Sequence, residues 1–381
     1  MNENTLKITI GGKWLGEDGD DDDNDNNGDL LSYVPKETNI ITTKNKFQGD
    51  LPNLKWKAFS KGDLYSHKRY IPLSTMKIID LKDEKSYKYI PQDDPHWKEI
   101  RLGRLTASRA AAALGFMEID SVEYLKMGKY MIDHQSIVDV YEKLKDKKFL
   151  MNPPSDITAV RMGWGTHHEV NAIINFLNQS NQFIVKETGF ELLTRKQILS
   201  VLNNEDRIII PYLPSIGASP DFVLQIDNKE VALGECKCPC PFREATDKDT
   251  KSPGKFCYKS YTYAHKQIPL YYIPQMMLQM LVTNMKKCIY FCYTPTKGCT
   301  MFEVKFNKEY CRLMLIYFAK FNKRFVIKNK KPSKNPFINE SLYKALLDMT
   351  LAIQLETIIK KREISPEKTL HNFKNNKIFL D

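Results

Sequence analysis

The sequence predicts an α/β fold in which a central mixed sheet is flanked by helices. Apolar residues recur at helical spacing over residues 159–178, and four strand-like runs follow. A helical stretch, two more strand-like runs and a helix come next, an order that is typical of layered α/β domains. The expected strands cover 183–192, 207–212, 217–226, 230–237, 287–293 and 300–306, and the other expected helices cover 97–115 (with a turn), 121–146, 271–284, 308–323 and 338–362.

Composition divides the 381 residues into four parts. Residues 1–55 are expected to form an acidic, mostly disordered leader, because its Asp/Asn/Gly tract has little apolar surface to bury. Residues 56–94 stay an unassigned N-terminal extension. Residues 95–325 are expected to fold as one domain, a length that a single core can support. Residues 326–381 contain a basic linker and the C-terminal helix.

The charge of the chain is segregated. The stretch 16–29 carries eight acids and no base, so without it the formal net charge of +11 becomes +19. A body this basic favours a polyanionic partner, with nucleic acid first. A lysine-rich, AT-biased coding sequence would produce the same balance without such a partner, so the charge alone leaves both interpretations open.

The cysteines indicate a reducing compartment. The N-terminus shows no basic region followed by an apolar core, and no apolar run reaches the ~18 residues of a membrane span. We therefore expect a soluble intracellular protein that is not secreted and has free thiols. The eight cysteines are Cys236, Cys238, Cys240, Cys257, Cys288, Cys292, Cys299 and Cys311.

The most informative spacing joins Asp221 to Glu235 and Lys237. Alternation along a strand sends residues 235 and 237 to one face, and pairing of neighbouring strands would bring Asp221 beside Glu235. Two carboxylates and an ammonium suit phosphodiester hydrolysis, because Mg²⁺ prefers carboxylate oxygens and activates water. Lys237 could orient that water, or share in deprotonating it if its pKa is depressed. The backbone carbonyl of Cys236 is a further candidate ligand.

Three other features allow more than one interpretation. Glu169, early in a helix, could add a third carboxylate or simply favour the helix N-terminus. The adjacent His167 and His168 diverge on a helix, and the Cys236-x-Cys238-x-Cys240 run lacks usual zinc spacing, so zinc is the weaker alternative at both. Gln275 and Gln279 share a helix face and could reach a phosphate or a water, or line an exposed edge.

Five motifs follow one another within residues 95–305. They are Trp97-x3-Arg101 followed by Leu105-Thr106-Ala107-Ser108; Gly165-x3-Glu169; Gly217-x-Ser219-Pro220-Asp221; Glu235-Cys236-Lys237-Cys238-Pro239; and Tyr271-Tyr272-x2-Gln275 leading into Leu281-Val282-Thr283. In this order they resemble the phage lambda exonuclease and YqaJ-like viral recombinase nucleases, within the PD-(D/E)XK restriction-endonuclease-like group. The resemblance implies a restriction-endonuclease-like core with a nuclease domain over 95–325.

The resemblance also implies roles for individual residues. Asp221, Glu235 and the Cys236 carbonyl would bind Mg²⁺, for which Mn²⁺ could substitute, Lys237 would act on the water, and Glu169 would be the additional acid. Arg101, Ser108, Ser219 and Gln275 would lie near a terminal 5′-phosphate or the edge of the active site. Two departures affect end recognition. Met277 stands where the family usually has a second glutamine, and some thirty residues rich in Lys and Tyr (241–269) separate the Glu235-x-Lys237 strand from the helix of Gln275.

The expected function is therefore a metal-dependent 5′→3′ exonuclease on double-stranded DNA ends, in viral recombination or DNA processing. The alternatives are an endonuclease or RNase with the same core, or an inactive protein that binds or anneals nucleic acid. The implied partners are duplex DNA with free ends, a single-strand annealing protein and further copies of the chain, but no membrane. If the source is a virus, the protein would act in the host cytoplasm or nucleus.

Overall fold

The computed structural model describes most of the predicted nuclease domain. The described residues are 5–9, 40–44, 55–56, 59–73, 84–146, 155–244, 256–258, 262–295, 297–359 and 379–380. Within the predicted leader, strands β1 (Thr5–Thr9) and β2 (Ile40–Lys44) pair antiparallel. The acidic tract over 16–29 lies outside the described residues.

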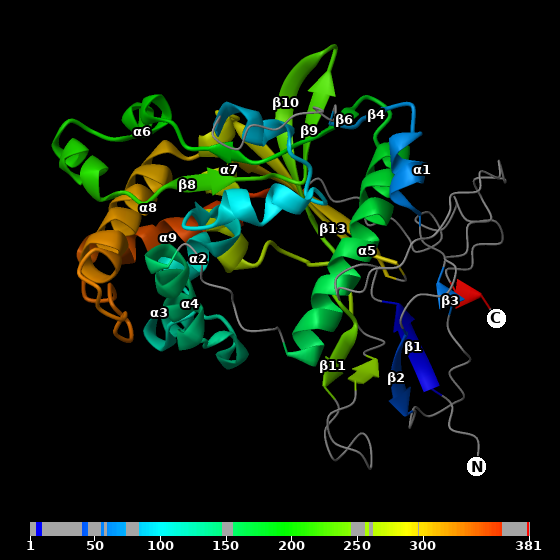
Figure 1. Cartoon of the computed structure of the whole chain (residues 1–381), viewed down its shortest axis with the longest axis horizontal. Helices are drawn as coiled ribbons and strands as arrows, with labels where there is room; N and C mark the ends of the chain where they lie inside the picture. Colours follow the sequence, from blue (N-terminus) through cyan, green and yellow to red (C-terminus); the bar gives the residue numbers. More distant parts are fainter. Residues whose placement is uncertain are drawn as a thin grey trace.

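A seven-stranded mixed sheet forms the centre of the molecule (Figure 1). Its middle strand, β10, pairs antiparallel with β9 and parallel with β13, so both kinds of pairing meet there. The strands lie in the order β15 (Ile358–Ile359), β14 (Gly298–Lys305), β13 (Lys287–Thr294), β10 (Lys229–Lys237), β9 (Phe222–Ile226), β6 (Ile184–Glu187) and β4 (Tyr70–Ile71).

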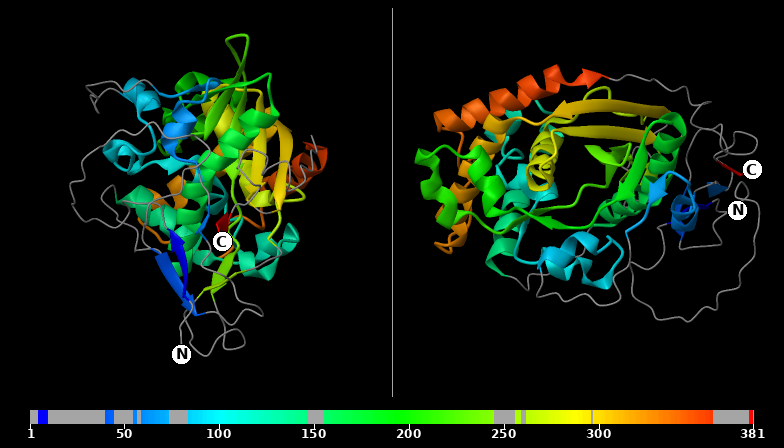
Figure 2. Two further views of the ribbon diagram at one scale, coloured as in Figure 1. Left: turned by 90° about the vertical axis from the view of Figure 1, so that its right-hand side faces the viewer. Right: turned by 90° about the horizontal axis from the view of Figure 1, so that it is seen from above.

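Helices cover both faces of this sheet. On one face, α5 (Asp156–Gln179) packs Ile173 and Phe176 against Phe222 and Phe291. On the other face, the cluster that includes Leu233 and Tyr290 joins the sheet to helices α2 (Ala110–Ala113), α4 (His134–Lys145), α7 (Ile273–Thr283), α8 (Lys308–Phe321) and α9 (Ser341–Glu356). Figure 2 shows α9 leading into β15 at the outer edge of the sheet. The predicted α/β class with a mixed sheet between helices is confirmed, and it agrees with a restriction-endonuclease-like core.

The burial of β13 follows from its place in the sheet. Seven of its eight residues are buried. A strand covered on both faces is apolar along its whole length, whereas a half-exposed strand alternates. The cysteines Cys288 and Cys292 on this strand therefore serve as small apolar side chains in the core.

The predicted strand over 207–212 is wrong. This segment belongs to a 3-10 helix, η6 (Glu205–Tyr212). Pro211 cannot donate a hydrogen bond to a sheet ladder. Ile208 is 77% exposed, whereas Ile209 and Ile210 are half-buried and pack against the core. Composition alone favoured a strand where the chain instead turns along the surface.

Other predicted elements are divided by turns. The strand expected over 217–226 becomes β8 (Ile216–Ala218) and β9, and the one over 183–192 becomes β6 and β7 (Glu191–Leu192). β8 joins a separate three-stranded sheet with β7 and β5 (Leu105–Thr106). The helix expected over 121–146 becomes α3 (Ile119–Tyr124), a 3-10 turn at Lys129–Met131 and α4, because Gly128 and the residues around it interrupt the helical run.

The helices expected over 97–115 are wrong for most of that segment, which forms 3-10 turns (Pro95–Trp97, Glu99–Arg101 and Ala107–Arg109), β5 and the short α2. The remaining helices keep the predicted order. The last of them, α9, is shorter than the predicted 338–362. A short helix, α1 (Lys61–Tyr65), lies in the extension that sequence left unassigned, and α6 (Arg195–Val201) follows β7. Across the described residues, none of the helices is both long enough and apolar enough to cross a membrane.

The close packing of β9 on β10 predicts that Gly234 tolerates no side chain. A methyl group at this position would overlap the ring of Phe222, which is fully buried and packs against Phe176. We expect Gly234→Ala to lower the free energy of unfolding by about 1–3 kcal/mol, as overpacked cores do. Urea unfolding followed by fluorescence measures this change.

Gly165 provides the matched control, because a methyl group added there meets no atom within 4 Å. In the interior of α5, Gly165→Ala should leave stability unchanged or raise it by up to about 1 kcal/mol. Equal unfolding midpoints for Gly234→Ala and the natural chain would show that the Phe222 ring has room to move.

Candidate active site

Asp221 and Glu235 lie side by side, as the alternation of residues along the strands predicts. Phe222 stands opposite Gly234 in the antiparallel ladder, and the Asp221 amide donates to the Gly234 carbonyl over 3.2 Å. The carboxylate of Asp221 accepts a hydrogen bond of 2.6 Å from the Cys236 amide through Oδ2. The Asp221 side chain is thereby fixed along the segment that carries Glu235 and Lys237.

Glu235 is held by three side chains, although only 1% of its side chain is exposed. Lys237 Nζ contacts its Oε1, which confirms that residues 235 and 237 share a face. From α7, Gln275 Nε2 donates to Oε1 over 2.5 Å and Gln279 Nε2 donates to Oε2 over 2.7 Å. The two glutamines predicted to share a helix face therefore do so, and in this structure they bind the carboxylate rather than a phosphate or a water.

The site carries more negative charge than its lysine offsets. Burial raises the pKa of Asp221 well above its usual range, and the charges of Glu235 and Glu169 raise it further. Burial likewise raises the pKa of Glu169 to about 7, where nearby Lys237 lowers it and Glu235 raises it. The carboxyl groups of Asp221, directly before β9, of Glu235 on β10 and of Glu169 on α5 are thus close enough to affect one another's pKa.

The environment of Lys237 raises its pKa rather than depressing it. Burial disfavours its ammonium, but the carboxylates of Glu235 and Asp221 outweigh that effect. The ammonium also lies 5.1 Å from the centre of the Tyr272 ring. Lys237 is therefore suited to orient a water or a phosphate oxygen as a cation, and the alternative in which it removes a proton loses support.

The donor set fits a hard divalent cation. Crowded carboxylates that repel one another are stabilised by such an ion, and Mg²⁺ needs only one or two carboxylates besides water. In the part of the chain that the structure describes, no three His, Cys, Asp or Glu side chains stand together as a ready-made metal site. Asp221, Glu235 and the Cys236 carbonyl remain the predicted ligands, and the role of Glu169 stays a prediction.

The structure gives the zinc alternatives no support. Burial raises the pKa of the Cys236 and Cys238 thiols, which disfavours the thiolates that zinc binds. His168 packs 4.1 Å from Trp164 between ring centres, and its Nδ1 lies 3.0 Å from the Asn171 amide nitrogen. Free thiols are found at Cys236, Cys238, Cys288, Cys292, Cys299 and Cys311, and the side chain of Cys257 lies outside the described residues.

Ser219 adds a polar atom beside the acids. Its hydroxyl oxygen is buried and has no hydrogen-bond partner, while its carbonyl accepts from Gln279 Nε2 over 3.3 Å. A buried hydroxyl without a partner carries a cost of desolvation, which a bound water or ligand removes. This position agrees with the predicted place of Ser219 at the edge of the site.

Three cations gather on the other side of the predicted binding region. The Arg101 guanidinium lies 5.5 Å from the centre of the Trp97 ring. Burial lowers the pKa of Arg101, and the charge of Arg109 lowers it further. Burial lowers the pKa of Lys143 on α4, and the positive charges of Arg101 and Arg109 lower it further, to about 8. Like charges brought together in this way form a site for an anion.

Arg101 makes no ion pair with Asp94 or Glu99, two acids close to it in the sequence, in the described part of the chain. Asp94 instead contacts the ring and the amide of His96, both at 2.8 Å. The sequence did not single out Arg109 or Lys143; Arg109 follows Ser108 directly, whereas Lys143 has no pattern that marks it.

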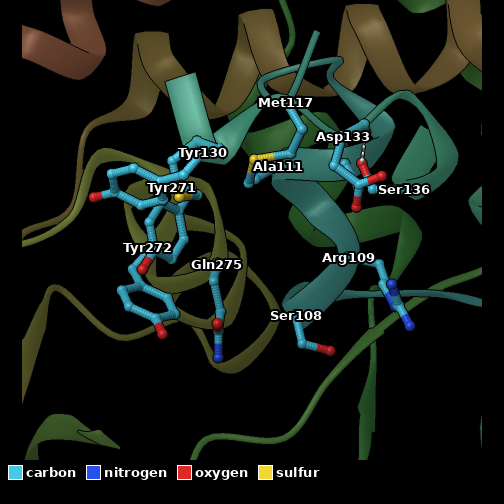
Figure 3. Close-up of a pocket in the computed structure, with 12 residues that line it drawn as sticks. Ser108, Arg109, Ala111, Met117, Tyr130, Asp133, Ser136, Tyr271, Tyr272 and Gln275 are labelled. Carbon is cyan, nitrogen blue, oxygen red and sulfur yellow. Dashed lines mark hydrogen bonds between the residues drawn. The ribbon is translucent and has the colours of Figure 1, made fainter. Parts of the chain in front are cut away.

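Ser108 and Gln275 meet in one cavity of about 290 Å³ (Figure 3). Arg109, Tyr271 and Tyr272 also line it, so the cavity links the cations to the glutamine that binds Glu235. Folding thus brings Ser108 and Gln275 together, although they are far apart in the sequence. Arg101 and Ser219 do not line this cavity, and the terminal-phosphate role of all four residues stays a prediction.

No curated protein matches the chain. Two solved structures are similar to it: an alkaline exonuclease (LHK-Exo) from Laribacter hongkongensis, and the same protein in complex with dAMP. In both comparisons the sequence identity is 18% and the TM-score is 0.37. The match covers 61% of this chain and 92% of the other chain. The model of the YqaJ-like viral recombinase domain matches residues 96–286, half of the chain. The chain therefore belongs to the YqaJ-like viral recombinase domain family.

Proposed function

We propose that this protein is a metal-dependent nuclease that acts as a 5′→3′ exonuclease on double-stranded DNA ends. The observation that carries the proposal is the group formed by Asp221, the buried Glu235 and Lys237. A polyanionic substrate suits the basic body of the chain, and membership of a recombinase family favours DNA.

Asp221, Glu235 and the Cys236 carbonyl would hold Mg²⁺ or Mn²⁺, with Glu169 as an additional acid. When bound, the metal ion would offset charge on the phosphate and lower the pKa of a water. Lys237 would then position the attacking water and neutralise charge on a phosphate oxygen. Gln275 and Gln279 would keep the Glu235 carboxylate in one orientation, because each donates to a different oxygen of it.

Arg101, together with Arg109 and Lys143, would bind the terminal 5′-phosphate, and Ser108, Ser219 and Gln275 would line the path from that phosphate to the acids. A terminal phosphate carries more negative charge than an internal one, so a cluster of cations distinguishes a strand end from the middle of a strand. We further propose that the protein acts inside cells, with a single-strand annealing protein and as a homo-oligomer.

The first prediction concerns the acids. Asp221→Asn keeps the shape of the side chain and its acceptor for the Cys236 amide, but removes the charge that binds the metal ion. We expect the rate of DNA cleavage to fall by about 1,000-fold or more, with DNA affinity unchanged or higher. Cleavage of end-labelled linear duplex with Mg²⁺ measures the rate, and circular duplex and RNA serve as the competing substrates.

Glu230→Gln is the matched control, because Glu230 lies exposed on the same strand and pairs with Lys186. This variant should cleave normally. Lys237→Ala should be inactive and still bind metal, so wild-type turnover by Lys237→Ala would show that the active site is assigned wrongly. Rapid cutting of circular duplex or RNA would favour the endonuclease or RNase alternative.

The second prediction concerns the strand end. Natural protein should prefer 5′-phosphorylated over 5′-hydroxyl ends, and Arg101→Ala should reduce that preference by about 10-fold or more, since a charge-assisted contact is lost. Arg101→Ala should cleave 5′-hydroxyl ends at the same slow rate as the natural protein. Equal rates of the natural protein on both ends would remove the end-reading role.

The third prediction concerns pH. The terminal phosphate is fully charged above its second pKa of about 6, whereas Lys143 loses its proton as the pH rises through about 8. The preference for phosphorylated ends, measured as kcat/KM, should therefore fall between pH 7 and pH 9. Lys143→Arg should abolish this fall, because arginine stays charged; an unchanged profile in Lys143→Arg would assign the titration to another group.

A further inference from the structure

The chain that follows α8 is rich in positive charge and lies outside the part matched by the family model. Residues 323–334, which we call the basic segment, carry six basic side chains and no acidic one. All six are exposed; they are Lys323, Arg324, Lys328, Lys330, Lys331 and Lys334. We propose that the basic segment binds the phosphate backbone of the duplex DNA behind the strand end. The inference rests on the proposed function, which supplies the DNA.

The backbone of the basic segment is anchored to the body of the protein. The Lys330 amide donates to the Phe325 carbonyl over 2.9 Å, and the Tyr141 hydroxyl on α4 donates to Asn329 Oδ1 over 3.1 Å. The Phe325 ring is buried and lies 6.5 Å from the Phe337 ring between centres. Aromatic packing and hydrogen bonds thus fix the part of the segment from which the lysines project.

A second anchor stands directly after the segment. The Asn335 amide donates to Glu118 Oε2 over 2.9 Å, and Asn335 Oδ1 accepts from the Asp120 amide over 3.0 Å. Glu118 is buried, and its other oxygen lies 2.8 Å from His134 Nδ1. A segment held at both ends does not have to be ordered when it binds, so less entropy is lost than with a flexible basic tail.

Acidic neighbours neutralise only part of this charge. Arg324 pairs with Glu340 at 2.8 Å, and Lys331 lies 4.0 Å from Glu142. Three lysines make no ion pair with any described residue; these are Lys328, Lys330 and Lys334. Exposed cations on a fixed backbone, without acids to pair with, attract a polyanion.

The basic segment continues the positive charge of the cation cluster at Arg101, Arg109 and Lys143. Its contacts with α4 are made next to Lys143, which follows Glu142 directly, and Lys145 is exposed one turn-face further along the same helix end. Figure 1 shows the turns after α8 at the lower left, beside α3 and α4. Duplex DNA carries one negative charge per ~1.7 Å of its axis, so a duplex whose terminal phosphate reaches Lys143 brings further phosphates to this surface.

Substitution of the three unpaired lysines tests the proposal. Lys328→Gln, Lys330→Gln and Lys334→Gln are combined in full-length Asp221→Asn protein, which should bind DNA without cutting it. Binding of linear duplex is followed by fluorescence anisotropy over a range of NaCl concentrations. Affinity should fall by about 10- to 100-fold near ~0.1 M salt, and the slope of log K against log salt should decrease by about 2–3, because each phosphate contact contributes ~0.9.

A matched triple variant removes the same net charge elsewhere. Lys229→Gln, Lys305→Gln and Lys308→Gln change exposed lysines at the start of β10, the end of β14 and the start of α8. The first two lie at the end of the sheet away from Lys237. The third lies roughly 20 Å along α8 from the basic segment. Affinity and salt slope should stay close to those of the parent protein.

The DNA ends separate this surface from the terminal-phosphate site. The basic-segment variant should lose the same affinity for 5′-phosphorylated ends, 5′-hydroxyl ends and closed circular duplex, since it contacts internal phosphates. A loss confined to phosphorylated ends would assign these lysines to the terminal phosphate and overturn the proposal. A loss confined to single-stranded DNA would overturn it as well, because the surface would then hold a displaced strand.

The remaining outcomes separate the inference from the proposed function. Equal losses in the two triple variants would show that net charge acts at long range, and unchanged binding by the basic-segment variant would show that the lysines touch no DNA. Either result overturns the basic segment as a binding surface and leaves the nuclease proposal standing. A parent protein that binds none of the DNA probes overturns both.

Discussion

The structure around β10 depends on the carboxylate of Glu235 being held in the interior. An ionised carboxylate removed from water is very costly unless charges and hydrogen-bond donors replace the lost solvent. Lys237 supplies the charge, and Gln275 and Gln279 supply the donors from α7. The register of α7 on the sheet is consequently fixed by polar contacts as well as by its apolar packing, since a shift of the helix would leave a buried charge without partners.

Positive charges are likewise brought together at the cation cluster. Arg101, Arg109 and Lys143 come from different elements, and burial together with the charges of the two arginines lowers the pKa of Lys143 to about 8. Folding therefore brings acids together at one end of the region and bases together at the other, and each group is destabilised by its own like charges. Under the proposed function, a phosphodiester with a metal ion would relieve both, because the metal ion would neutralise the acids and the phosphate would neutralise the bases.

The catalytic strands were predictable from the sequence because alternation is a local property. Glu235 and Lys237 lie two residues apart on one strand, and the turn back from β9 leaves Asp221 beside them, so no distant contact had to be known. The helix face shared by Gln275 and Gln279 was predictable in the same way, but their partner was not, since only packing decides what a face meets. Lys143 gave no signal because its role depends on two arginines more than thirty residues away. The segment 207–212 was mistaken for a strand because its isoleucines suit either a buried strand or an exposed turn, and Pro211 decided the outcome.

The layering of the fold explains why the acids gather where they do. Along most of its length β10 is covered on one face by α5 and on the other by the α7 side of the core. The ladder between β10 and β9 stops at the pair Gly234 and Phe222, because Phe222 is the first residue of β9. Asp221, the residue before it, lies beyond the ladder. Glu169 reaches the same region from the α5 layer, as its influence on the pKa of Asp221 requires. Carboxylates from both layers therefore converge at this end of the strand, and under the proposed function the substrate would approach there as well.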